Sequence, residues 1–221
     1  MIRAALELLH TATEPTIEAY DVEAPDEAGP QQWACPVNLA TESTGSLGDR
    51  LAAEVARLRP WSAETRRARG RTLFGASGAD PDQVDEVAAA LVTIAETGDV
   101  LVPPASEVDW AFSMPLLIRH LADDLRTFYH EAVAAQPGPG APNHDALNDW
   151  IFGGTALGDT LTAIADHLTE VEDQPMTKLV RGFLIPEGRF RGGSAFPTDR
   201  SGQQPAARGT EAQTATDPKA S

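Results

Sequence analysis

The sequence predicts an all-α protein that folds as an irregular multi-helix bundle of about six to eight helices. Apolar residues recur at helical spacing in successive segments between residues 47 and 184. Residues that start and stop helices bracket most of these segments. One run has β character, VLVPP at residues 100–104, and its two prolines cut it short.

The first part of the chain combines a short helix with a long irregular segment. A helix is expected over residues 2–11, and residues 14–45 then contain many prolines and glycines. A connection this long is uncommon in a compact domain unless it is a lid, a binding arm or disordered. Because Trp33 lies within it, we expect part of the segment to dock. The folded domain is expected to cover residues 1–185.

Helices are then predicted in close succession. Pro60 is expected to separate a helix over residues 47–59 from one over residues 62–73. Asp80 and Gln83 form a capping box that starts the next helix, which ends at Gly98. Further helices are predicted over residues 107–135, with Pro115 either kinking it or starting its successor, and over 143–152, 155–172 and 175–184.

The end of the chain predicts a disordered tail over residues 186–221. Beyond Phe190 and Phe196 this segment has almost no large apolar residues, so burial cannot offset the entropy lost on folding.

The net charge of −16 is distributed unevenly. Residues 72–175 contain 18 Asp or Glu and only two Arg, whereas residues 57–71 contain six Arg and one Glu. A field this negative repels nucleic acid and anionic membranes, and it attracts a cationic ligand or a basic partner. The simpler alternative is that the charge keeps the protein soluble.

The sequence favours a cytoplasmic location. Cys35 is the single cysteine, so no intrachain disulfide can form. No apolar run reaches the roughly 18 residues that a membrane span requires. Arginine outnumbers lysine 15 to 2, which is typical of a GC-rich bacterial genome.

The helix predicted after Pro115 contains the candidate catalytic residues His120, Asp124 and Glu131, which lie along the border of its apolar face. A carboxylate at the edge of a core is desolvated and can exchange protons near neutral pH. The structural alternative is that these residues pair with a neighbouring helix. A metal site would need more ligands than one helix supplies, so we expect neither a metal nor another cofactor.

Four arginines are candidates for anion binding: Arg66, Arg67, Arg69 and Arg71. The planar guanidinium group suits phosphate, sulfate or carboxylate. Alternatively, these arginines neutralise the acidic middle of the same molecule.

The stretches HLADDLRTFYHEA and ALNDWIFGGTALG resemble segments of uncharacterised all-helical proteins of high-GC Gram-positive bacteria, over roughly residues 105–185. The resemblance implies no activity, and no functional residue follows from it.

Two functions remain open. The first is a cofactor-independent tailoring enzyme, or enzyme subunit, of bacterial small-molecule biosynthesis that uses the three candidate residues on a cationic or amine-bearing substrate. The second is a non-catalytic accessory protein that binds and stabilises a partner enzyme through an exposed helix face and the 14–45 arm. The expected partners are a small-molecule substrate or a protein, in a hetero- or homo-oligomer, and not nucleic acid or a membrane.

Overall fold

The computed structural model describes residues 2–14, 45–136, 142–171 and 175–186. In these ranges the chain is all-helical, with seven α-helices, one short 3₁₀ helix and no strand. This confirms the predicted fold class. The elements are α1 (Ile2–Thr11), α2 (Leu47–Arg69), η1 (Pro81–Gln83), α3 (Val84–Thr97), α4 (Leu116–Ala135), α5 (His144–Gly154), α6 (Ala156–Glu170) and α7 (Pro175–Leu184). Residues 15–44 of the predicted arm and 187–221 of the predicted tail lie outside the described residues.

The prediction of two helices separated by Pro60 was wrong, because α2 is one continuous helix. It runs without a break through Pro60 and ends at Arg69, where Gly70 caps it in a left-handed conformation with a φ of 64°. Proline inside a helix costs about 3 kcal/mol because it removes a hydrogen bond. Burial on both sides of it offsets this cost, with Leu51 and Leu58 before Pro60 and Thr65 after it. Tertiary packing therefore overrides a local helix-breaking residue.

Two other boundaries follow local chemistry. Asp80 and Gln83 form the predicted capping box, which starts η1 and leads into α3. Pro115 immediately precedes α4, so the helix begins at residue 116 and the predicted helical stretch at 107–114 is absent. The predicted β-like run at residues 100–104 is irregular.

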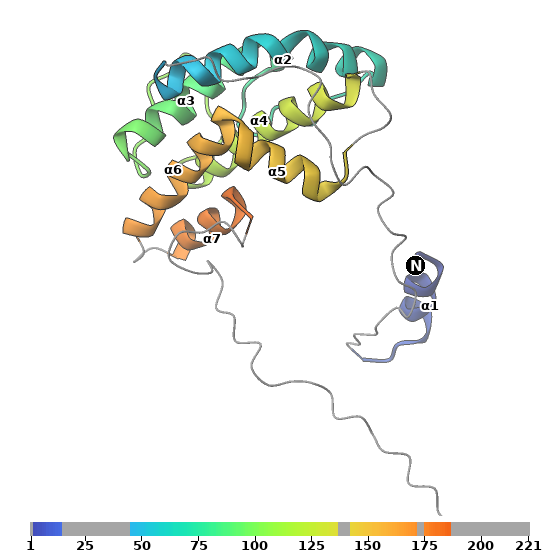
Figure 1. Ribbon diagram of the computed structural model, residues 1–221. Coiled ribbons are helices and arrows are strands. Elements are labelled where there is room, and N and C mark those ends of the chain that lie inside the picture. The colour runs from blue at the N-terminus through green and yellow to red at the C-terminus, as the bar shows by residue number, and fades with distance from the viewer. Residues whose placement is uncertain (1, 15–44, 137–141, 172–174, 187–221) are drawn as a thin grey trace, which may run out of the picture.

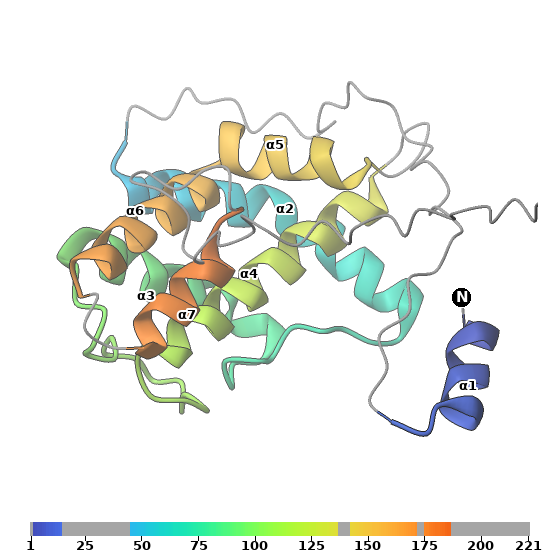
Figure 2. The same cartoon turned by 90° about the horizontal axis from the view of Figure 1, so that it is seen from below.

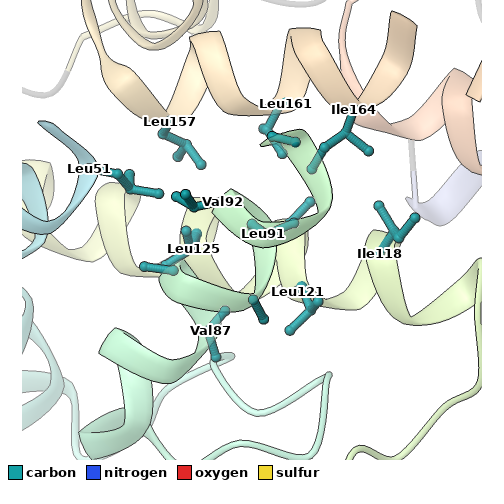
Figure 3. Packing of buried hydrophobic residues seen from close by; sticks show 14 of the residues in the cluster. Leu51, Val87, Leu91, Val92, Ile118, Leu121, Leu125, Leu157, Leu161 and Ile164 are labelled. Carbon is teal, nitrogen blue, oxygen red and sulfur yellow. The ribbon is translucent and has the colours of Figure 1, made fainter. Parts of the chain in front are cut away.

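The core lies where α4 meets its neighbours. Helix α4 packs against α2, α3 and α7, and α6 packs against α2, α3, α5 and α7. Figure 3 shows side chains from α2, α3, α4 and α6 meeting in one cluster that includes Leu51, Leu91, Leu125 and Leu161. Because α4 is covered on several sides, it buries polar residues as well as apolar ones.

The helix α1 differs from the others. None of its residues is buried, and the two views in Figures 1 and 2 draw it apart from the bundle. Among the described residues, no helix combines the length and the apolar character needed to cross a membrane.

Candidate functional site

The three candidate catalytic residues lie on α4 in three different environments. Asp124 is fully buried, and its carboxylate accepts four hydrogen bonds from the loop between α2 and η1. The amides of Gly75 and Ala76 donate to Oδ1, each at 2.8 Å. The amide and the hydroxyl of Ser77 donate to Oδ2 at 3.0 and 2.5 Å. Asp124 thus fastens this loop to α4.

Glu131 joins α4 to α2 and to the segment that follows α2. Its Oε2 accepts a hydrogen bond from the hydroxyl of Ser62 at 3.0 Å, and its Oε1 accepts one from Thr72 at 2.6 Å. Its main-chain carbonyl accepts a further bond from Thr65 at 2.6 Å. Ser62, the residue at which a separate helix was predicted to begin, is instead a buried partner of this carboxylate.

His120 contacts neither of these carboxylates. Its ring stacks on Phe112 with 4.1 Å between the ring centroids. Its Nδ1 lies 4.0 Å from Oδ2 of Asp123 and makes no hydrogen bond with any residue that the structure describes. The structure therefore places the three residues on one helix, as the sequence indicates, but gives Asp124 and Glu131 structural partners of their own. That arrangement matches the alternative in which border residues pair with neighbouring segments.

The opposite side of α4 is less exposed than its sequence pattern indicates, because α7 covers it. Arg126 donates hydrogen bonds to the carbonyl oxygens of Phe183 and Leu184, which terminate α7. The guanidinium carbon of Arg119 lies 4.1 Å from the centroid of the Phe183 ring. Asp123 forms ion pairs with both arginines, at 3.5 and 3.6 Å. These side chains bind α7 to the bundle.

One buried carboxylate was missed by the sequence analysis. Glu54 of α2 accepts a hydrogen bond from the hydroxyl of Tyr129 at 2.6 Å and another from the amide of Ala156 at 2.7 Å. It therefore caps the first turn of α6, where unpaired amides favour a negative charge. Its position between Leu51 and Leu58 on the apolar face of α2 was a readable sign of burial.

Burial sets the proton affinities at this cap. It raises the pKa of Glu54, while the hydrogen bonds from Tyr129 and the α6 amides and the charge of Arg50 act in the opposite direction. The pKa of Tyr129 lies well above its ordinary value, because of burial first and the neighbouring Glu54 second. The hydrogen bonds of these two groups connect α2 with α4 and α6.

The arginines near the end of α2 divide into two groups. Arg59 pairs with Asp85 of α3 at 2.6 Å, and Arg67 pairs with Glu64 one turn away, also at 2.6 Å. In contrast, Arg66, Arg69 and Arg71 form no ion pair with any residue that the structure describes. Neutralisation of the acidic body therefore accounts for some of the arginines only.

A groove of about 240 Å³ lies beside this cluster. Its lining comes from the end of α2 and the segment after it, together with one side of α4: Arg69, Arg71, Thr72, Leu73, Thr127, His130 and Glu131. The groove includes Glu131 but neither His120 nor Asp124. Within the described ranges no group of three or more His, Cys, Asp or Glu could hold a metal ion.

Comparisons with protein-family models, with curated protein sequences and with solved structures return no match for this chain.

Proposed function

We propose that this chain is a non-catalytic accessory protein that binds a partner protein through α1. The supporting observation is a row of apolar side chains on α1: Ile2, Leu6 and Leu9 are 78, 61 and 81% exposed. They recur at positions i, i+4 and i+7, so they share one face of the helix. Amphipathic helices that insert into a groove of another protein use this spacing for their anchors.

The energetics of α1 favour a role in binding. A helix of 10 residues is marginal in water, where isolated helices need roughly 12–15 residues for appreciable stability. Transferring a Leu or Ile side chain from water into an apolar groove is worth about 1.5–3 kcal/mol. Three anchors therefore supply enough free energy to hold α1 helical in a complex.

The charge of the body indicates the chemistry of the partner. Between residues 72 and 175, 18 acidic residues face only two arginines. Ion pairs that reach this segment from α2, such as Arg50 with Asp159, compensate only part of the excess. We infer a partner with an apolar groove flanked by lysine or arginine, because complementary charge accelerates association and fixes orientation.

The positions of the candidate acids also favour this function over the tailoring enzyme. A general base needs a lone pair that can reach the substrate. The carboxylate oxygens of Asp124 and Glu131 already accept hydrogen bonds from the protein. The enzyme hypothesis stays a prediction, and a pair of variants described below tests it.

The test compares the full chain with Leu6→Gln/Leu9→Gln and with a control on the polar face, Glu7→Gln/His10→Gln. Glutamine is a good helix former, so both variants keep the propensity of α1. A tagged protein expressed in its native host should retain a stoichiometric partner, and the purified partner should bind the apolar-face variant at least about tenfold more weakly. The control should bind normally, and salt should weaken the wild-type complex.

Equal binding by the two variants would show that α1 is not the binding element. A protein that self-associates in light scattering, and loses this property with Leu6→Gln/Leu9→Gln, would show that a second copy covers α1. Either result overturns the proposal that α1 binds a different protein.

A further inference from the structure

The groove between the end of α2 and α4 has a positively charged rim. Arg69 and Arg71 line it, are exposed, and form no ion pair with the described residues. Elsewhere in the bundle, guanidinium groups such as those of Arg50 and Arg59 reach across to carboxylates of other helices, at 2.7 and 2.6 Å. In a chain with 33 acidic residues, this groove is therefore lined by two arginines that have no ion-pair partner among the described residues.

Helix stabilisation explains only part of this charge. Basic residues in the last turn interact favourably with the carbonyl end of a helix, and α2 has Arg66, Arg67 and Arg69 there. Arg71 lies beyond Gly70, which terminates the helix. The carbonyl end of α2 therefore does not account for Arg71.

Glu131 at the floor of the groove offsets only part of the charge of the rim, because one carboxylate lies beside two arginines. Glu131 is only 5% exposed, and its two carboxylate oxygens accept hydrogen bonds from Ser62 and Thr72. The opposite side contributes the hydroxyl of Thr127 and the ring of His130, which can donate hydrogen bonds to an anion. Leu73, at the same groove, is 80% exposed and offers an apolar contact.

We propose that this groove binds the oxyanion group of a small organic molecule, a phosphate or a carboxylate, between the guanidinium groups of Arg69 and Arg71. Each guanidinium group presents two parallel N–H donors, a geometry that matches the oxygens of such anions. The apolar part of the ligand lies against Leu73. A volume of about 240 Å³ restricts the ligand to the size of a small metabolite.

Two charge-matched double variants test the site. Arg69→Gln/Arg71→Gln removes the arginines that line the groove, and Arg66→Gln/Arg67→Gln removes two that do not. Sulfate at low millimolar concentration should raise the melting temperature of the wild type and of the second variant by about 3 °C, since a ligand stabilises the native state by mass action. The first variant should show no rise beyond that given by chloride at equal ionic strength.

A second measurement concerns the apolar contact. Phenyl phosphate should stabilise the protein more than inorganic phosphate does, and Leu73→Ser should remove only this difference. Equal effects of the two phosphates would contradict an organic ligand. If both arginine variants lost the sulfate effect equally, or if neither lost it, Arg69 and Arg71 would not form a specific site. The effect of sulfate would then be general screening.

The anion site and the proposed partner are separable, because the site does not involve α1. Arg69→Gln/Arg71→Gln should leave partner binding intact, and Leu6→Gln/Leu9→Gln should leave the sulfate effect intact.

Discussion

At the scale of single residues, adjacent acids on α4 have different surroundings. Asp124 is fully buried and accepts hydrogen bonds from residues 75–77. Asp123 is 38% exposed and pairs with arginines on its own helix. The same side-chain chemistry therefore has a different role one position along the helix, because the direction of the side chain decides its partners.

This difference gives a matched comparison. Asp124→Asn should reduce the free energy of unfolding by about 3 kcal/mol, because an amide nitrogen would face the amide donors and the charge would be lost. Asp123→Asn should change it by less than about 1 kcal/mol, as expected for a partly exposed ion pair. Urea denaturation measures both values. A loss of function in Asp124→Asn without a loss of stability would instead support the tailoring-enzyme hypothesis.

The cap formed by Glu54 predicts a pH dependence. Because burial raises the pKa of this carboxyl above its ordinary value of 4.5, the folded state binds its proton more tightly than the unfolded state does. Its contribution to stability should therefore decrease as the pH rises from 4.5 through the folded pKa. Urea denaturation of the wild type and Glu54→Gln at several pH values from 4.5 to 7 measures this contribution. The wild type should lose stability relative to the variant as the pH rises; a constant difference would contradict the assignment.

At the scale of elements, the junction between α5 and α6 depends on a close backbone approach. Gly158 lies in the first turn of α6, and a Cβ atom there would come within 2.1 Å of the carbonyl oxygen of Ile151. At Gly158 the contact is so close that no side chain fits.

Gly158→Ala should therefore destabilise the protein by more than about 3 kcal/mol, since the clash is with backbone and cannot relax locally. Gly153→Ala is the control, because a Cβ atom at Gly153 would meet nothing within 4 Å. That variant should be neutral or more stable by up to about 1 kcal/mol, the usual gain of alanine over glycine in a helix. Thermal unfolding followed by circular dichroism compares the two. Similar melting temperatures would mean that α5 can move away from α6.

At the scale of the whole molecule, local signals in the sequence were sufficient for much of the fold. Caps such as Asp80 and Asn143 involve residues within three positions of each other, so their helix starts could be predicted. The continuation of α2 through Pro60 could not, because it depends on packing against helices far along the chain.

In the candidate site, too, features set by local sequence could be predicted, and features set by contacts between distant segments could not. The angular position of Asp124 and Glu131 on α4 followed from helical periodicity, and both residues lie at the core. Their partners come from segments 47 to 69 positions away, which periodicity does not specify. The groove likewise arises from two segments that meet only in the folded bundle.

The tie between Glu54 and the first turn of α6 has a consequence for folding during synthesis. The carboxylate and the amide of Ala156 are separated by 102 positions in the chain. A ribosome that adds roughly 5–20 residues per second synthesises α2 about 5–20 seconds before Ala156, whose amide donates the hydrogen bond to Glu54. During that interval the charge of Glu54 interrupts an apolar face of α2 that nothing yet covers, and we expect this to limit aggregation of the nascent chain. The same carboxylate then binds α6 when the bundle closes.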